Sequence, residues 1–331
     1  MPSVHPVCYV SGSAPVSCLD FHQPDHSPGQ ILAGDVEGRL YAWSLLSWEC
    51  QQKIRIFPAG GCTFLRCIGD QIILQGRLTK GENSALVLMG LQDREGVSNW
   101  TKIWQADKED YNHDGFCKGS NHGQVLALPL GTSDIQVCIK DEAQVKKLAL
   151  LRLDSNVFGN LMSVKVSKIE DQIRILSGSE NGCIHLWDWA DALILAKFEL
   201  APMIPFALDF DSSSAQGFIG GDQEYVVSFK IQNGNFQKLC QREIPSKGIS
   251  HAQIRKSGGK IVVSACWDST IRVFSWVKPS QLKPLGALKF HSETIEAVQC
   301  ARKPVASHGN KILIAAASKD KKISFWDIYN E

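Results

Sequence analysis

A short hydrophobic pattern recurs along the chain at intervals of roughly 40–50 residues, a period typical of propeller and solenoid arrays. In each copy, an aliphatic residue is followed three positions later by a bulky or sulfur-containing residue. The seven pairs are Leu40/Trp43, Leu86/Met89, Ile135/Cys138, Ile184/Trp187, Val226/Phe229, Ile271/Phe274 and Ile323/Trp326.

The spacing within each copy indicates a β-strand that is apolar on both faces. Residues two apart in a strand share a face, so Ile184 and Leu186 lie on one face while Trp187 and Trp189 lie on the other. A strand with two apolar faces is buried on both, as the inner strands of a propeller blade are by the neighbouring blades. Helical solenoids would show a period of 3.6 residues instead. Seven copies therefore predict an all-β, seven-bladed propeller.

Strand-like segments between the copies allow the blades to be delimited. We expect a single propeller with blades at about 16–58, 62–106, 115–153, 161–200, 204–244, 249–290 and 294–328. The last blade lacks an outer strand, whereas a spare strand-like segment, about residues 6–11, precedes the first blade. We predict that this N-terminal strand completes the last blade, because such closure removes an open junction from the ring.

Composition narrows the class of protein. Lys and Arg number 35 and Asp and Glu 34, which gives a net charge of +1 and no basic excess that would indicate direct nucleic-acid binding. No apolar run is long enough for a membrane span, and the first residues do not resemble a signal peptide. Eleven scattered cysteines favour a reducing compartment. We therefore expect a protein of the cytoplasm or nucleus.

Three segments resemble WD40 repeats: "SGSENGCIHLWDW" (177–189), "SACWDSTIRVF" (264–274) and "AASKDKKISFWDI" (316–328). The resemblance implies a buried hydrogen-bonded set in each blade, made of a His before the first strand, a hydroxyl on the second, an Asp in the following turn and a Trp on the third. Blade seven has His291, Asp320 and Trp326 with Ala316 at the hydroxyl position; blade six has Ser264 and Asp268 with Phe274 for Trp; blade four has Ser177 and Trp187 with Asn181 for Asp. No blade has the full set, so we expect the repeats to depend more on apolar packing.

The segments "LDFDSSSAQGFIGG" (208–221), "WDSTIRVFSW" (267–276) and "FHSETIEAVQC" (290–300) resemble the G-protein β-subunit-like protein 1 family, also called ASTRA-associated protein 1. This resemblance implies a non-enzymatic scaffold linked to the ASTRA and Triple T co-chaperone assemblies, which mature phosphatidylinositol-kinase-related protein kinases. Its partners would be subunits of those assemblies or their kinase clients. A Gγ partner is not expected, because the short segment before blade one contains Pro2 and Pro6 and has no heptads for a coiled coil.

Three other functions remain to be weighed. The chain could be a generic WD40 adaptor in another intracellular complex, or a hydrolase or metal-dependent enzyme that uses His291 and Asp320. We favour a structural role for that pair, since no nucleophile is apparent. His22 with His26, and Cys62 with Cys67, do not have the spacing of a zinc site. No cofactor or metal is expected.

Partners of propellers often bind the face where the turns before the third strands meet the channel. Position by position, the residues exposed there would be Val36, Glu180, Asp222, Trp267 and Lys319. Trp267 could be packed under a loop or form an exposed anchor, and exposed aromatic residues are favoured hot spots. Residues 93–122 form a polar insertion, in which "NWTKIW" (99–104) should be an outer strand and the following stretch a solvated loop, more a plain excursion than a partner contact.

Overall fold

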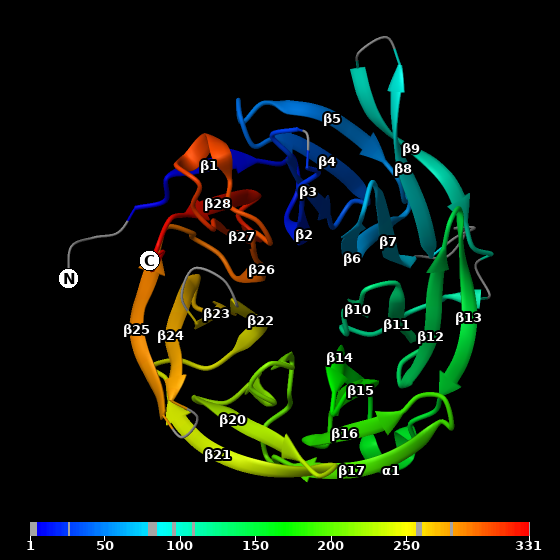
Figure 1. Cartoon of the computed structure of the whole chain (residues 1–331), viewed down its shortest axis with the longest axis vertical. Coiled ribbons are helices and arrows are strands. Elements are labelled where there is room, and N and C mark those ends of the chain that lie inside the picture. Colours follow the sequence, from blue (N-terminus) through cyan, green and yellow to red (C-terminus); the bar gives the residue numbers. More distant parts are fainter. Residues whose placement is uncertain are drawn as a thin grey trace.

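The computed structural model forms a ring of seven four-stranded antiparallel sheets around a central channel (Figure 1). It describes residues 5–25, 27–78, 85–94, 97–107, 110–255, 260–278 and 281–330. This architecture confirms the predicted seven-bladed β-propeller. In six of the blades the strand order follows the chain.

Each blade begins with its inner strand and ends with its outer strand. Blade one contains β2 (Val16–His22), β3 (Gln30–Asp35), β4 (Arg39–Ser44) and β5 (Cys50–Arg55); blade two contains β6 (Gly60–Ile68), β7 (Gln71–Leu78), β8 (Leu86–Arg94) and β9 (Val97–Gln105). Blade three contains β10 (Ser120–His122), β11 (Val125–Leu130), β12 (Asp134–Asp141) and β13 (Gln144–Leu151); blade four contains β14 (Leu161–Ile169), β15 (Gln172–Ser179), β16 (Cys183–Asp188) and β17 (Leu193–Glu199).

The remaining blades follow the same plan. Blade five contains β18 (Ala207–Asp211), β19 (Gln216–Gly220), β20 (Tyr225–Gln232) and β21 (Asn235–Glu243); blade six contains β22 (Ile249–Arg255), β23 (Ile261–Cys266), β24 (Thr270–Lys278) and β25 (Gln281–Lys289). Blade seven contains β26 (Ile295–Cys300), β27 (Ile314–Ser318), β28 (Lys322–Trp326) and β1 (Cys8–Ser11). Short helices α1 (Ser155–Phe158) and η2 (Ala306–His308) lie in loops, and no helix within the described ranges is long and apolar enough to cross a membrane.

The ring is closed by the N-terminal strand, as predicted. β1 pairs antiparallel with β28 and places Val10 opposite Ile323. Backbone hydrogen bonds extend the pairing at both ends, from Val7 N to Phe325 O and from Gly12 N to Lys321 O, each 2.8 Å long. Figure 1 shows β1 at the outer edge of the last blade, beside the start of blade one.

The repeated bulky residue marks a shared irregularity in the sheets. In each of the first six blades, the pairing between third and fourth strand shifts register directly before it, at Trp43, Met89, Cys138, Trp187, Phe229 and Phe274. Such bulges bend a strand and increase its twist. The inner three strands of each blade carry most of the core, whereas β17 alternates between exposed and half-buried residues. The sequence repeat is therefore a repeat of backbone geometry as well as of burial.

Candidate functional site

The five rim residues expected from the sequence occupy equivalent places in their blades. The backbone N–H of Val36, Glu180, Trp267 and Lys319 donates to a carbonyl at the start of the first strand of its own blade or just before it, at Pro15, Asn160, Gly248 and Thr294 respectively. These bonds are 2.9–3.0 Å long. Asp222 makes the corresponding connection through its side chain, whose Oδ1 accepts from Ile204 N at 2.7 Å. At one end of the ring, the turns before the third strands are therefore hydrogen-bonded to the first strands in an equivalent way in these five blades.

Trp267 is both packed and exposed. One face of its indole covers Gly248, whose φ of +92° is a conformation that favours glycine, and a Cβ at that position would lie 2.0 Å from Trp267 Cδ2. Its ring also meets Phe206 edge-on, with centroids 5.6 Å apart. Even so, 41% of Trp267 remains exposed. The side chain is therefore held in place while it presents an aromatic surface to solvent.

The charged rim residues have different roles. Glu180 Oε2 accepts from Asn160 N at 3.0 Å, so this carboxylate, like that of Asp222, holds the loop before a first strand. Lys319 reaches Glu296 at 3.2 Å and is otherwise exposed. Val36 is 48% exposed. Of the five, Val36, Trp267 and Lys319 are therefore available for contact with a partner.

In blade seven a chain of hydrogen bonds connects the turn to the tryptophan. His291 Nδ1 lies 2.9 Å from Asp320 Oδ2, His291 Nε2 lies 2.8 Å from Ser324 Oγ, and Trp326 Nε1 donates to the same hydroxyl at 2.8 Å. The hydroxyl expected on the second strand, where Ala316 stands, is supplied by Ser324 on the third. The sequence comparison with the repeat pattern therefore missed Ser324, and blade seven does have a complete set.

The order Asp320–His291–Ser324 matches that of a hydrolase triad, but its setting is structural. Ser324 is fully buried, and its hydroxyl already accepts from the indole of Trp326. Burial lowers the pKa of His291 despite the nearby carboxylate. The pKa of Asp320 is also lowered, because hydrogen bonds from Lys322 N and His291 outweigh its burial. The His291–Asp320 pair fixes the loop to the turn, and the hydroxyl of Ser324 is buried beneath them.

Blades four and six contain partial versions of this chain. In blade four, Trp187 Nε1 donates to Ser177 Oγ at 2.8 Å, and Asn181 Oδ1 accepts from Ser179 Oγ at 2.8 Å. In blade six, Ser264 Oγ donates to Arg272 O at 3.1 Å and does not reach the turn. Asp268 instead binds Ser246 Oγ at 2.5 Å, Thr270 Oγ1 at 2.6 Å and the guanidinium of Arg272.

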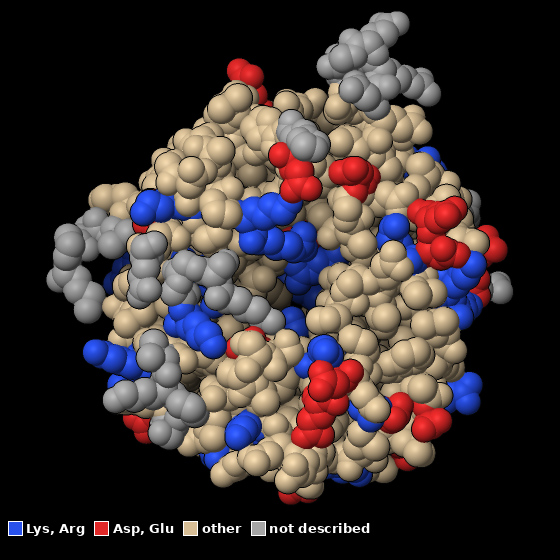
Figure 2. Space-filling model, viewed as in Figure 1, with Lys and Arg blue, Asp and Glu red and all other residues tan. Residues whose placement is uncertain are grey.

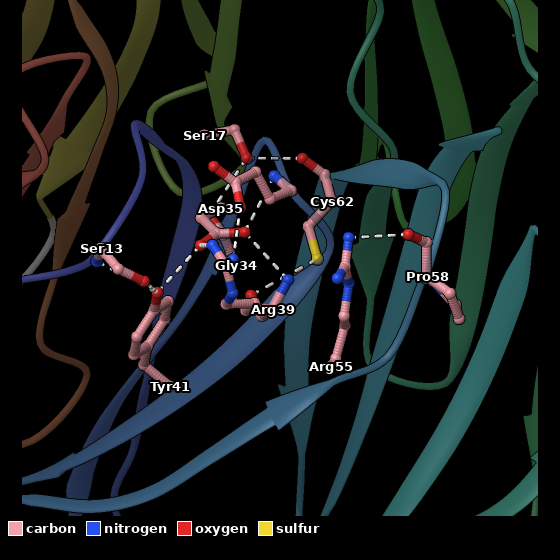
Figure 3. Close-up of polar contacts among 10 residues, drawn as sticks. Ser13, Ser17, Gly34, Asp35, Arg39, Tyr41, Arg55, Pro58 and Cys62 are labelled. Atoms are coloured by element: carbon pink, nitrogen blue, oxygen red, sulfur yellow. Dashed lines mark hydrogen bonds and ion pairs between the residues drawn. The ribbon is translucent and has the colours of Figure 1, made fainter. Parts of the chain in front are cut away.

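Blade one has a network of its own, centred on Asp35 (Figure 3). Asp35 Oδ1 accepts from the backbone N–H groups of Glu37 and Arg39, both at 2.9 Å. Asp35 Oδ2 accepts from Tyr41 OH at 2.9 Å, and that hydroxyl lies 2.6 Å from Ser13 Oγ. In the repeat pattern the turn Asp would stand at position 37, where this chain has Glu37. Asp35 lies two positions earlier, so a position-by-position comparison with the pattern did not identify it.

The candidate metal ligands do not form a cluster. His22 Nε2 lies 3.4 Å from Asp70 Oδ1, and its ring packs edge-on against Trp100, while His26 lies outside the described residues. Cys62 and Cys67 are buried thiols whose pKa values burial raises well above the usual range. In the part of the chain that the structure describes, no three His, Cys, Asp or Glu side chains are grouped as metal ligands would be.

The segment after β9 differs from the solvated loop that we expected. Residues 99–104 lie in β9, but Tyr111 and His113 beyond them are buried. The ring of His113 lies 3.1 Å from Gly131 O and 2.9 Å from Cys117 O, so it ties the segment to blade three. The segment then leads to Phe116, which is 71% exposed.

Phe116 belongs to a groove of about 790 Å³ on the rim, where blades one, two, three and seven meet. We call this the channel-mouth groove; it is lined by Val36 and Lys319 together with Pro15, Ser17, Glu37, Arg55, Pro58, Ala59, Gly60, Gly61, Cys62, Thr63, Arg77, Phe116, Lys118 and Glu296. Arg55, Arg77, Phe116 and Lys118 were not candidates from the sequence, because nothing in their local patterns links residues from different blades. The alternation of charge and aromatic residues in 110–118 was the available signal.

Comparison with known proteins agrees with this structure. A family model described as "WD domain, G-beta repeat" matches residues 282–327. The chain is 28% identical over 327 residues to guanine nucleotide-binding protein subunit beta-like protein 1 of Mus musculus, covering 95% of this chain and 93% of that protein.

Two proteins named ASTRA-associated protein 1 match shorter stretches. That of Schizosaccharomyces pombe is 39% identical over 124 residues, which is 32% of this chain and 31% of that protein. That of Schizosaccharomyces japonicus is 43% identical over 74 residues, which is 22% of this chain and 18% of that protein. The chain is a seven-bladed β-propeller that matches the WD40 repeat at residues 282–327 and is similar over nearly its whole length to guanine nucleotide-binding protein subunit beta-like protein 1.

Proposed function

We propose that the protein is a non-enzymatic interaction scaffold that serves as an adaptor of the ASTRA/Triple T co-chaperone system. In this role it would help to mature phosphatidylinositol-kinase-related protein kinases in the cytoplasm or nucleus. Its partners would be subunits of that system or their kinase clients. The proposal is supported by the similarity to two proteins named ASTRA-associated protein 1 and by the WD40 architecture, whose typical role is protein–protein interaction.

The main structural support for the scaffold role is the rim, where hydrogen-bonded turns expose large apolar side chains. Its turns are tied to the first strands by backbone bonds at equivalent places, yet they present Trp267 and Val36 with nearly half of each residue exposed. A large apolar side chain on a rigid support loses little conformational entropy on binding, which is the property of interface anchors. The buried set around His291 serves the same purpose, because it fixes a loop of this rim.

Affinity purification of the tagged full-length chain from its own cells, followed by mass spectrometry, tests the proposal. Enrichment of ASTRA or Triple T subunits, or of the kinases, is the expected result. The same purification with Trp267→Ala tests whether the exposed rim is the binding surface, because this variant should recover less of the partners. Recovery of an unrelated intracellular complex alone would contradict the co-chaperone role and favour a generic adaptor. Recovery of a Gγ subunit alone would contradict both.

A further inference from the structure

Positively charged side chains are concentrated in the channel-mouth groove. Arg55, Arg77, Lys118 and Lys319 line it, against Glu37 and Glu296. Both acidic residues already have partners, because Glu37 pairs with Arg39 outside the groove and Glu296 pairs with Lys319 at 3.2 Å. The chain as a whole is nearly neutral, so this concentration of charge is local.

Three of the four cations contact carbonyl oxygens instead of carboxylates. Arg55 Nη2 donates to Pro58 O at 2.8 Å, as Figure 3 shows, and Arg77 donates to Gly115 O. Lys118 Nζ donates to Ser17 O at 3.0 Å and to Glu296 O at 2.5 Å. None of these three pairs with a carboxylate among the described residues, and Arg77 Nε is buried there without a hydrogen-bond partner. Within the described ranges, none of the three therefore has a carboxylate partner of its own, although burial lowers the pKa of Lys118 and the charge of nearby Glu296 partly offsets this.

The groove also opens into a basic channel. Phe116 and Lys118 line a second cavity inside the ring, together with Arg66, His251 and the ion pair of Lys165 with Asp209. Burial and the charges of Lys118, Arg66 and Lys165 hold the pKa of His251 well below its usual range. Figure 2 shows Lys and Arg side chains gathered around the central channel on the face turned to the viewer. Cations along a narrow channel attract anions to its mouth, because low-dielectric walls focus the field.

An apolar surface lies beside these charges. Phe116 is 71% exposed and stacks against the guanidinium of Arg77, whose Cζ lies 4.9 Å from the ring centroid. Val36, Pro58 and the adjacent glycines continue this surface across blades one and two. An exposed aromatic residue flanked by arginine is the composition of interface hot spots.

From these features we infer that the channel-mouth groove binds an acidic peptide segment of a partner protein, one that carries Asp and Glu around a bulky apolar side chain. The apolar side chain packs on Phe116 and Val36, while carboxylates pair with Arg55, Arg77 and Lys118. The inference deepens the proposed scaffold function, on which it rests, by naming the chemistry of the partner. A nucleic acid could pair with the cations and stack a base on Phe116, so a single-stranded oligonucleotide is included in the test below.

Fluorescence anisotropy with the full-length protein tests this inference. The probe is a short fluorescein-labelled peptide of Glu and Asp with one central Trp. It should bind, and its affinity should fall as NaCl rises. Phe116→Ala and the double variant Arg55→Glu/Arg77→Glu should each weaken binding by about tenfold or more. A version of the probe with Lys for every acid should not bind.

Matched controls come from exposed residues outside the groove. Leu193→Ala on β17 and Arg242→Glu on β21 should leave the affinity unchanged, and thermal unfolding should show that every variant is folded. The inference is overturned if the acidic probe does not bind, if the groove variants bind it as the native protein does, or if a short single-stranded oligonucleotide binds as tightly and Phe116→Ala has no effect. Loss of ASTRA recovery with intact peptide binding would contradict only the proposed co-chaperone role. The reverse outcome would contradict only the groove assignment.

Discussion

Ala316 and Ser324 lie directly opposite each other across β27 and β28, and the hydroxyl expected at the first is carried by the second. In blade four the corresponding strands hold the hydroxyl on the other side, because Ser177 of β15 accepts from Trp187 Nε1. The indole-to-hydroxyl distance is 2.8 Å in both blades. Either strand of the pair can therefore supply the oxygen that the tryptophan needs.

Removing this hydroxyl should destabilise the protein. Ser324→Ala removes the hydroxyl that the buried indole N–H of Trp326 and the Nε2 atom of His291 both contact. We expect a loss of about 1–3 kcal/mol in the free energy of unfolding, measured by urea denaturation. Ser98→Ala, at an exposed position on β9, is a control that should change little.

The hydroxyl should also be transferable between the strands. Adding Ala316→Ser to Ser324→Ala restores the arrangement of blade four, so the double variant should recover part of the lost stability. Urea denaturation of the two variants side by side measures this recovery. A double variant no more stable than Ser324→Ala would contradict the equivalence of the two positions.

Closure of the ring gives a third prediction. Val10 is 6% exposed and lies in the same apolar cluster as Ile323 and Phe325, whereas Val7, three residues earlier, is 47% exposed. Val10→Ala should lower the free energy of unfolding by about 1–2 kcal/mol, and Val7→Ala should have little effect. Deletion of residues 1–12 should lower the melting temperature further, since it uncovers the edge of β28. Unchanged melting after the deletion would show that β1 does not support the fold.

The ring and its closure could be predicted from the sequence because both follow from counting strands, and each strand shows a hydrophobic pattern within one short segment. Seven copies of one pattern fixed the number of blades, and a missing outer strand at one end matched a spare strand at the other. The position of Ser324 could not be predicted in the same way. Matching by position treats each strand separately, whereas a hydroxyl can act from either of two paired strands.

The segment at 106–118 and the groove show a second limit of the sequence. Its polar composition predicted a solvated loop, yet Tyr111 and His113 are buried, because the ring of His113 lies between Cys117 O, 2.9 Å from Nε2, and Gly131 O of blade three, 3.1 Å from Nδ1. The groove beyond it combines Arg55, Arg77 and Phe116 from different blades. Such a site forms only when the blades are arranged around the channel, and no short stretch of sequence shows which residues of different blades will lie together.

Acid should destabilise the protein through buried histidines, and His185 makes the clearest test. It is fully buried on β16, where its ring meets Phe158 edge-on with centroids 4.6 Å apart. Burial, with a contribution from the charge of Lys197, lowers the pKa of His185 to about 4. Because the unfolded chain binds a proton near the ordinary pKa of about 6.5, stability is fully present above that pH and declines as the pH falls toward 4.

The contribution of His185 to this decline is about 3 kcal/mol, since each pKa unit corresponds to about 1.4 kcal/mol. His185→Phe removes the titrating group, so the free energy of unfolding should depend on pH less steeply between about 4 and 6.5. Urea denaturation at several pH values gives the slope for each protein, and the two slopes should differ by close to one proton. Equal slopes would show that His185 does not titrate on unfolding. His22, His113, His251 and His291, whose pKa values are also lowered, should keep some acid sensitivity in the variant.

Trp267 should matter for binding more than for folding. The indole covers Gly248 and touches Phe206, but its exposed edge faces solvent on the rim. Trp267→Ala should therefore keep a cooperative thermal transition, with a loss of stability of about 1–2 kcal/mol, while recovery of partners in affinity purification falls several-fold. Leu193→Ala removes an exposed aliphatic side chain far from the rim and should affect neither measurement. If Trp267→Ala abolishes the cooperative transition, the side chain is part of the core. If partner recovery is unchanged in a folded variant, the partner binds elsewhere on the ring.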